Sequence, residues 1–179
     1  MEGSLPSQAV EVLVVDGMSD DGTRAAVQEL HDRWPNVRLV DNPRKITPVA
    51  LNLGIRQSQG EFICILGAHA YLSPNYLEVA VRKIQEQGAD AVGGVMVTLN
   101  QNTSAMGRLI QTILSSRFGV GSSFRTCLNE GPTDTVVFGV YRREVFVKYG
   151  LFHEQLVRNQ DNEFNSRLRA AGCRLWVTP

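Results

Sequence analysis

The segment VVDGMSDDGT, residues 14–23, gathers three carboxylates in one short turn. It begins inside the apolar run VEVLVV, residues 10–15, whose β-branched side chains are typical of a strand buried on both faces. Asp16 ends that run, and the carboxyl ends of strands in an open parallel sheet face the ligand crevice. A carboxylate there could accept hydrogen bonds from a nucleobase or ribose, and it would repel phosphates. The alternative is an Asx residue that only forms the turn.

The other polar residues of this turn have a simpler structural explanation. Ser19, Asp20 and Asp21 can each cap the helix expected after the turn, because a side-chain oxygen there accepts a free backbone N–H. Acidic side chains also suit the positive end of the helix dipole. Capping therefore explains two of the three acids and leaves Asp16, with Ser19 beside it, as the candidate nucleotide-binding pair.

A second group of candidates follows EFICIL, residues 61–66, which is expected to be a strand. Ala68 and His69 stand just beyond its end, at the same crevice edge as Asp16. A histidine beside a nucleotide can ligate a divalent metal or contact phosphate. A lone histidine is more often an ordinary packed or surface residue, and both interpretations stay open.

A third group lies in VRNQDNEFNSRLRAAG, residues 157–172, which has the apolar spacing of a helix. The apolar stripe consists of Phe164, Leu168 and Ala171. Asp161 falls in the first turn, where the helix dipole would keep it ionised, as a general base requires. The alternative makes Asn159 a helix cap and Asp161 a surface acid.

The rival of Asp161 as a base is Glu163, which has Arg167 four residues further on. This spacing predicts an ion pair on the solvent side of the helix. Arg44 and Lys45, after the second expected strand, could neutralise a diphosphate, or they form a solvated loop. Asp134 could steer an acceptor, or it only begins a strand.

Strands and helices alternate along the chain. Strands are expected at residues 10–15, 37–40, 61–66, 89–97, 134–142 and 173–177, and helices after the acidic turn, after residues 47 and 73, and at 103–118 and 160–171. This order predicts an α/β fold, with a Rossmann-like, mostly parallel sheet and helices on both faces. No repeat or linker interrupts it, so residues 1–179 are expected to form a single domain.

Helix boundaries and buried faces follow from the residue types. Thr47 and Ser73 each precede a proline, so both are expected to cap a helix, and Gly88 is expected to end the second one. The expected buried stripes are Val27, Leu30 and Trp34 in the first helix, and Leu77, Ala80, Val81 and Ile84 in the helix before Gly88.

Composition excludes several classes of protein. Eighteen acidic and eighteen basic residues give a net charge of zero, so the protein has no overall electrostatic field that would attract it non-specifically to nucleic acid or membranes. No apolar run approaches the ~20 residues of a membrane span. The three cysteines are scattered, and the beginning of the sequence has no signal pattern, so a cytoplasmic protein is expected. A dehydrogenase is disfavoured because no G-x-G-x-x-G follows a strand, and G-x-S-x-G and H-E-x-x-H are absent.

Taken together, three motifs resemble a family 2 glycosyltransferase domain of the GT-A type. They are EVLVVDGMSDDGT, the stretch NPRKITPVALNLGIRQSQGEFICILGAHAYLSPNYLE, and DTVVFGVYRREVFVKYGLFHEQLVRNQDNEFNSRLRAAG. The RNQDNE turn and the histidine after the third strand are similar to the exopolysaccharide (succinoglycan-type, ExoA-like) branch. The resemblance extends over residues 10–179.

The resemblance implies a role for each group. Asp16 would contact uracil or an equivalent base, and Asp161 would be the base that deprotonates the acceptor hydroxyl. Residues 67–69 stand at the family's Asp-x-Asp, which binds ribose and, through a metal, the diphosphate. The implied reaction is inverting transfer of a sugar from a nucleotide-sugar donor, UDP-linked, to a saccharide or lipid-linked acceptor in polysaccharide biosynthesis.

The sequence departs from the family's pattern at this motif and at its ends. Gly67 has no side chain for ribose or metal, and His69 can ligate Mn²⁺ or Mg²⁺ but prefers softer metals, so metal dependence stays open. The resemblance places a further strand before residue 10 and membrane-contacting segments after residue 179. Truncation at both ends and peripheral association with the inner face of the membrane are therefore expected. The alternative function is a non-catalytic nucleotide-sugar-binding domain.

Overall fold

The computed structural model describes residue 6 and residues 9–97 and 129–179. The helices are α1 (Thr23–Arg33), α2 (Thr47–Gln57), α3 (Tyr76–Gln87), α6 (Arg143–Tyr149) and α7 (Gln160–Ala170). The strands are β1 (Val12–Asp16), β2 (Val37–Asp41), β3 (Phe62–Cys64), β4 (Ala91–Gly94), β5 (Gly131–Pro132), β6 (Val140–Arg142) and β7 (Leu175–Thr178). The helix expected at 103–118 lies outside the described residues. Within the described ranges, every helix is too short or too polar to span a bilayer.

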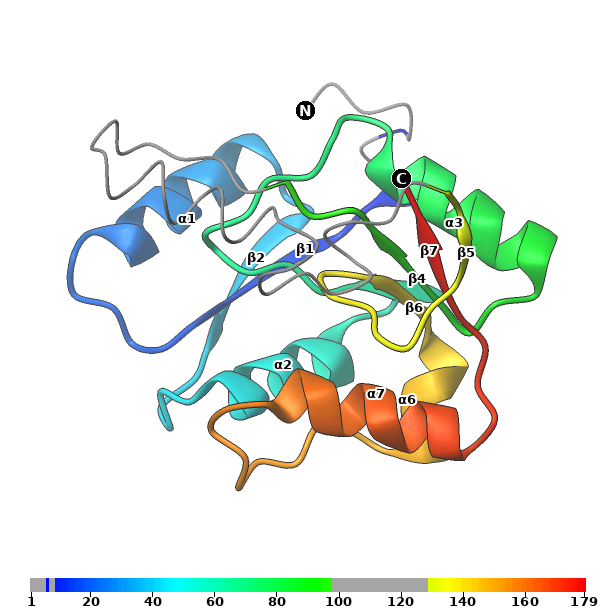
Figure 1. Cartoon of the computed structure of the whole chain (residues 1–179). Helices are drawn as coiled ribbons and strands as arrows, with labels where there is room; N and C mark the ends of the chain where they lie inside the picture. Colours follow the sequence, from blue (N-terminus) through cyan, green and yellow to red (C-terminus); the bar gives the residue numbers. More distant parts are fainter. Residues whose placement is uncertain (1–5, 7–8, 98–128) are drawn as a thin grey trace, which may run out of the picture.

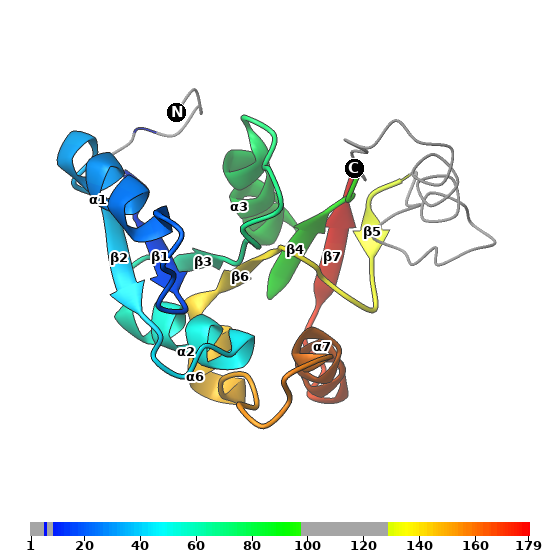
Figure 2. The ribbon, with the colours of Figure 1, turned by 90° about the vertical axis from the view of Figure 1, so that its left-hand side faces the viewer.

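The strands form two sheets with helices on both sides, which confirms the expected α/β class (Figure 1). One sheet has the order β1-β2, and the other has the order β3-β6-β4-β7-β5. Helices α1 and α3 lie on one side of the strands, and α2, α6 and α7 lie on the other (Figure 2). The expected parallel pairing holds for β1–β2 and β4–β7, whereas β3–β6, β4–β6 and β5–β7 are antiparallel.

Two apolar clusters hold the helices against the larger sheet. On one side, Phe164 of α7 is fully buried, stacks on Phe146 at 5.4 Å between ring centroids, and lies 4.5 Å from Phe152. On the other side, Ala80 and Ile84 of α3 are fully buried against the strands. Burial of each large side chain contributes about 1.5–3 kcal/mol, so these contacts fix how α3 and α7 sit on the sheet.

The helix starts differ from the expectation in their caps. Ile46, rather than Thr47, occupies the N-cap position of α2, and Thr47 is its first residue. Helix α3 begins only at Tyr76, after a turn in which the Tyr76 N–H donates to the Ser73 carbonyl. Pro48 lies in the first turn of α2, whereas Pro74 lies two residues before the start of α3, and neither helix has a side-chain cap. Gly88 ends α3 in the left-handed conformation, as expected.

Two burial expectations were wrong on the side of the small sheet. Leu30 and Trp34 are 44% and 39% exposed, because α1 covers a sheet of only two strands and Trp34 lies beyond the helix. Residues Val12 to Val15 of β1 are half-buried rather than buried on both faces. The only partner of β1 among the described residues is β2, and its other side borders a cavity.

The strand expected at residues 134–142 is also shorter than predicted. Only Val140–Arg142 is extended and paired, because Phe138 has a positive φ of 50° that interrupts the strand. Helix α6, which follows at once, was not expected from the sequence. Strand β5 was not expected either. The other strands, β1, β2, β3, β4 and β7, and helix α7 lie where the pattern predicted, with shifts at their ends.

Candidate functional site

Asp16 ends β1 with both carboxylate oxygens engaged by neighbouring donors. Its Oδ1 accepts the hydroxyl of Ser19 at 2.5 Å, and its Oδ2 accepts the Ser19 backbone N–H at 2.8 Å. Arg24 of α1 adds a third donor, with Nη1 3.0 Å from Oδ2. These hydrogen bonds, those from Ser19 first, lower the pKa of Asp16 to about 2. Asp16 is only 6% exposed and organises the turn that carries Ser19.

Arg24 links Asp16 to a second carboxylate that sequence reasoning missed. Its Nη2 lies 2.8 Å from Oδ1 of Asp41, the last residue of β2. Asp16 and Asp41 are register partners in the parallel pair, so two like charges stand side by side at the carboxyl ends of their strands. Arg24 forms an ion pair with each of them, which compensates one of the two negative charges. In the sequence, both strands end in aspartate. That the two aspartates lie side by side can be inferred only once the pairing of β1 with β2 is known.

The acidic turn caps α1 with other residues than expected. The N-cap position of α1 is Gly22, which has a positive φ of 90°. Asp21 accepts the backbone N–H of Thr23 at 3.1 Å, and so it satisfies a free donor of the first turn. Asp20 is exposed.

Arg44 and Lys45 have different surroundings. Arg44 pairs with Glu154, with Nη1 2.6 Å from Oε2, and Asn52 donates to Oε1 of the same carboxylate at 3.1 Å. The hydrogen bond from Asn52 and the charge of Arg44 lower the pKa of Glu154. Lys45 is exposed, and its Cα is 3.6 Å from where a Cβ on Gly17 would lie. Lys45 therefore passes directly beside the acidic turn, whereas Arg44 ties its loop to the segment before α7.

The motif at residues 67–69 makes an aromatic contact with Phe138. The ring of His69 meets the ring of Phe138 edge-on, with centroids 5.7 Å apart. A Cβ on Gly67 would come within 3.0 Å of both rings. Glycine therefore fits this arrangement best, because any larger side chain would require both rings to shift by a few tenths of an ångström. Ala68 and His69 are exposed.

Phe138 is a further site residue that no signal in the sequence indicated. Its φ of 50° lies in the left-handed region, which is uncommon for residues other than glycine and is often found at functional sites. The hydroxyl of Tyr76 donates to the Phe138 carbonyl at 2.8 Å and holds this conformation. Burial, the largest cause, raises the pKa of Tyr76 well above its ordinary value, so its hydroxyl stays a donor.

The side chains at this motif do not fit a Mn²⁺ or Mg²⁺ site. Such metals take mainly oxygen ligands from several residues, and Gly67 supplies none. Among the described residues, no group of three or more His, Cys, Asp or Glu side chains could hold a metal ion. His69 alone is the ligand type that the motif offers.

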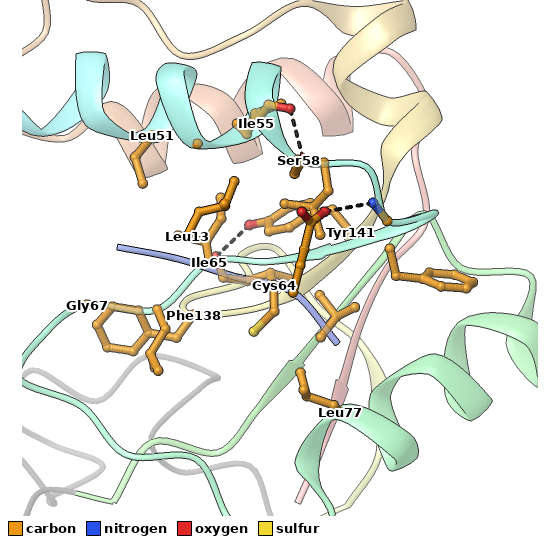
Figure 3. Close-up of a pocket in the computed structure, with 18 of the residues that line it drawn as sticks. Leu13, Leu51, Ile55, Ser58, Cys64, Ile65, Gly67, Leu77, Phe138 and Tyr141 are labelled. Carbon is orange, nitrogen blue, oxygen red and sulfur yellow. Dashed lines mark hydrogen bonds between the residues drawn. The ribbon is translucent and has the colours of Figure 1, made fainter. Parts of the chain in front are cut away.

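Asp161 lies in the first turn of α7 and borders the cavity that His69 also borders. Its Oδ1 accepts the backbone N–H of Asn162 at 2.9 Å, and its carbonyl accepts the Asn165 side chain at 2.9 Å. The cavity has a volume of about 1100 Å³, and its lining includes Gly67, Ala68, His69, Phe138, Gln160 and Asp161. Figure 3 shows Gly67 and Phe138 side by side at one end of it.

The other acidic and polar candidates of this region lie outside the cavity lining, and three of them can be described by their local contacts. The predicted ion pair is confirmed, because Glu163 accepts from Arg167 at 2.8 and 3.0 Å. Asn159 occupies the N-cap position of α7 but makes no side-chain cap, and its φ is 59°. The Asp134 side chain is 84% exposed and pairs with Arg169 of α7 at 3.0 Å. Asp134 and Asn159, like Asp16, Ser19, Arg44 and Lys45, are not part of the cavity lining.

Comparison with known proteins decides the family. A family model described as glycosyl transferase family 2 matches residues 4–150. The chain belongs to glycosyl transferase family 2. Among curated proteins, this family 2 chain is 29% identical to the succinoglycan biosynthesis protein ExoA of Rhizobium meliloti (strain 1021), over 98% of the chain and 53% of ExoA. The likeness to the exopolysaccharide branch, seen in the RNQDNE turn, is thereby confirmed.

A second curated relative is 30% identical. It is the dolichyl N-acetyl-alpha-D-glucosaminyl phosphate 3-beta-D-2,3-diacetamido-2,3-dideoxy-beta-D-glucuronosyltransferase of Methanococcus voltae, matched over 97% of this chain and 56% of that protein. The family 2 chain thus spans about half the length of the curated relatives it matches.

Solved structures of glycosyltransferases share the fold, which confirms the expected GT-A type. S. aureus TarS in complex with UDP-GlcNAc superposes with a TM-score of 0.72 at 18% identity, over 99% of this chain and 49% of that one. The mannosyltransferase PcManGT of Pyrobaculum calidifontis, in complex with GDP-Man and Mn²⁺, gives a TM-score of 0.69 at 23% identity, over 99% and 48%.

Proposed function

We propose that this family 2 chain carries the catalytic site of an inverting glycosyltransferase. It transfers a sugar from a UDP-linked donor to a saccharide or lipid-linked acceptor during polysaccharide synthesis at the cytoplasmic face of the membrane. The observation that carries the proposal is the position of Asp161. This residue lines the same cavity as His69, lies in the first turn of α7, and has no ion-pair partner among the described residues.

Asp161 acts as the general base in this proposal. It takes the proton of the acceptor hydroxyl while the hydroxyl oxygen forms a bond to C1 of the donor sugar. The bond between C1 and the diphosphate oxygen breaks in the same step, and its electron pair leaves with the nucleoside diphosphate. One displacement inverts the configuration at C1. General-base assistance of this kind contributes about 10²–10⁴-fold to the rate.

The charges around the site support a binding mode for the donor. Lys45 is exposed beside the acidic turn, so it and His69 are the groups we assign to the diphosphate. Asp16 and Ser19 take the base or ribose, although donors already occupy both carboxylate oxygens of Asp16. Arg44 contributes through its loop, because its guanidinium is engaged by Glu154. Asp134 and Asn159 are assigned to the acceptor side.

Replacing Asp161 tests the mechanism directly. Asp161→Asn should lower kcat by about 10²–10⁴-fold and leave donor affinity within about twofold, since a base is needed only in the transition state. The matched control is Glu163→Gln on the same helix turn, which should keep its activity because Glu163 serves the ion pair with Arg167. Full transferase activity in Asp161→Asn would remove Asp161 from the mechanism. A fall in donor affinity equal to the fall in kcat would make it a binding residue.

A non-catalytic nucleotide-sugar-binding domain is the second candidate. The crowding at Gly67 favours it, since no acid can enter the motif without moving the ring of His69 or Phe138. Turnover of the unmodified chain distinguishes the two functions. Binding of UDP-sugars without transfer or hydrolysis, measured with radiolabelled donors, would favour the second.

A further inference from the structure

A buried amide ties helix α2 to the segment that leads into α7. Asn52 of α2 is 2% exposed, and its side chain pairs with the backbone of Phe152, 100 positions later in the chain. Oδ1 of Asn52 accepts the Phe152 N–H at 3.0 Å, and Nδ2 donates to the Phe152 carbonyl at 2.9 Å. The amide pairs with Phe152 as a backbone peptide group would, so it fixes the position of this residue against α2.

The ring of Phe152 packs directly against α7. Phe152 is 6% exposed, and its ring centroid lies 4.5 Å from that of Phe164. Phe164 is fully buried and follows Asp161 by about one turn of the same helix. Because side chains in a densely packed core do not shift independently, a displacement of Phe152 would also displace the first turn of α7, which carries Asp161.

Arg167 holds the same segment from the side of α7. Its Nη2 donates to the Leu151 carbonyl at 2.8 Å, and its Nη1 donates to the Tyr149 carbonyl. Helices α2 and α7 lie on the same side of the strands (Figure 2). Residues 149–154 therefore run between two attachments, Asn52 on α2 and Arg167 on α7, and they set the position of one helix relative to the other.

Glu154 attaches the donor side of the proposed site to this segment. Nδ2 of Asn52 donates to Oε1 of Glu154 at 3.1 Å, and Nη1 of Arg44 lies 2.6 Å from Oε2 of the same carboxylate. Arg44 precedes Lys45, which we assign to the donor diphosphate. The amide of Asn52 thus contacts both the residue that packs against α7 and the carboxylate that holds the loop of Lys45.

No other common side chain would make these contacts. The amide uses its oxygen once and its nitrogen twice, on Phe152 and on Glu154. Aspartate has the same shape but cannot donate, and leucine has no polar atom to offer. The three contacts together, rather than burial alone, explain an asparagine at this position of α2.

We propose that Asn52 is a positioning residue for glycosyl transfer, which sets the place of Asp161 relative to the loop of Lys45 through Phe152 and Glu154. The inference rests on the proposed function, in which Asp161 is the base and Lys45 contacts the donor. Asn52 does not line the cavity, so it acts through these neighbours. A base misplaced by about 1 Å can cost about 10²-fold in rate, because attack needs a narrow range of distances and directions.

Asn52→Asp tests this role with a side chain of the same shape. The carboxylate still accepts the Phe152 N–H, but it cannot donate to the Phe152 carbonyl or to Glu154, and it adds a negative charge beside Glu154. The rescue variant combines Asn52→Asp with Glu154→Gln, whose amide can donate to the carboxylate at position 52. Gln57→Glu makes the same change from amide to carboxylate at an exposed position of α2, and it is the matched control.

The first readout separates turnover from nucleotide binding. Release of UDP from UDP-glucose and UDP-GlcNAc, with water as acceptor, is measured well below the unfolding temperature of each variant, and UDP affinity is measured by calorimetry. In Asn52→Asp, kcat should fall about 10–10²-fold relative to Gln57→Glu. UDP affinity should stay within about threefold, because the Asn42 N–H still ties the loop to the Asp16 carbonyl at 2.8 Å.

The rescue variant should regain most of the lost turnover. Recovery to within about threefold of the control supports a role in positioning, since the pair of side chains at positions 52 and 154 is restored in another form. Lower stability of Asn52→Asp with unchanged kcat would overturn the inference, because the amide would then serve the fold alone. A loss of kcat that the rescue variant does not reduce would overturn it as well.

Hydrogen–deuterium exchange gives a second readout that does not need turnover. Peptides that cover residues 152–164 should exchange about tenfold faster in Asn52→Asp than in Gln57→Glu, and the rescue variant should reverse this. If the unmodified chain releases no UDP, or if Asp161→Asn releases it at the full rate, the proposed function fails, and exchange alone decides whether Asn52 fixes the first turn of α7. Equal exchange in all variants overturns the inference at any level of activity.

A milder pair of variants covers the case that Asn52→Asp does not fold. Asn52→Ser leaves a hydroxyl that can serve only one of the two backbone groups of Phe152, and Gln57→Ser is its control. Both measurements are then made on this pair, with the same expected differences in kcat and in exchange. Equal values in the two serine variants would overturn the inference.

Discussion

Asn165 of α7 and Val136 of the β5–β6 loop hold each other through two hydrogen bonds. The Val136 N–H donates to Oδ1 of Asn165 at 3.2 Å, and Nδ2 of Asn165 donates to the Val136 carbonyl at 3.1 Å. The same Nδ2 donates to the carbonyl of Asp161 at 2.9 Å. Both partners are 2% exposed. One buried amide therefore ties the loop that carries Phe138 to the helix turn that carries Asp161.

Replacing this amide should affect both stability and catalysis. Asn165→Leu has a similar volume but leaves the Val136 N–H buried without its partner, whereas the Val136 carbonyl still accepts from the Tyr141 hydroxyl at 3.3 Å, so we expect a loss of about 1–3 kcal/mol. In urea unfolding, the exposed Asn162→Ala on the same helix should change stability by less than about 0.5 kcal/mol. In steady-state kinetics, kcat should fall more than KM rises. A loss of stability with unchanged kcat would show that Asn165 does not position Asp161.

The lowered pKa of Asp16 predicts an acid-dependent stability. The folded-state pKa is about 2, below the ordinary value of 3.8, so ionised Asp16 stabilises the fold above pH 3.8. This contribution is lost as the pH falls from 3.8 through about 2. Denaturant unfolding at several pH values should therefore show a slope in this window that Asp16→Asn weakens. Asp20→Asn, an exposed acid of the same turn, is the control and should keep the slope.

The same position tests nucleotide recognition. Calorimetry with UDP should show weaker binding in Asp16→Ala, provided that circular dichroism shows an intact fold. Unchanged affinity would leave Asp16 as a turn-forming residue that serves Ser19 and Arg24 alone.

Nucleotide binding should depend little on metal. A single imidazole at His69 is a weak site for Mn²⁺, and Gly67 adds no ligand, so UDP affinity with Mn²⁺ and with a chelator should differ by less than about tenfold, or 1.4 kcal/mol. Calorimetry under both conditions measures this. A larger dependence that disappears in His69→Ala would restore the metal role implied by the family resemblance.

Adding a methyl group at Gly67 should be costly. Its Cβ would lie 3.0 Å from the rings of His69 and Phe138, and overpacking of this kind costs about 1–3 kcal/mol. Gly131→Ala is the matched control, because nothing lies within 4 Å of the added atom there. Thermal unfolding should separate the two variants by several degrees. If Gly67→Ala is as stable as Gly131→Ala, the rings move easily and the crowding does not explain the glycine.

Interactions that depend on local spacing could be predicted from the sequence. The pair between Glu163 and Arg167 follows from helix geometry alone, because side chains four residues apart share one face. The position of Asp161 in the first turn of α7 followed from the same periodicity. Alternation of strands and helices likewise predicted the α/β class.

Interactions between distant segments could not be predicted in this way. Arg44 meets Glu154 across 110 positions, and Arg24 meets Asp41 only because β1 pairs with β2. The left-handed backbone of Phe138 depends on a hydroxyl donated from α3. The shared position of Gly67 and Asp161 on one cavity depends on how α7 packs against the larger sheet. Each of these contacts can be predicted only when it is known which strands and helices pack together.

Because Arg24 bridges both Asp16 and Asp41, we expect substitutions at these three positions to depend on one another during evolution. Loss of Arg24 alone would leave two adjacent carboxylates without their shared counter-charge, whereas prior loss of Asp41 would make the arginine dispensable to one of them. Loss of Asp41 followed by loss of Arg24 should therefore be tolerated, whereas loss of Arg24 before Asp41 should not. In related sequences, we expect the residues at positions 24 and 41 to change together, and position 16 to vary only where the arginine has already been replaced.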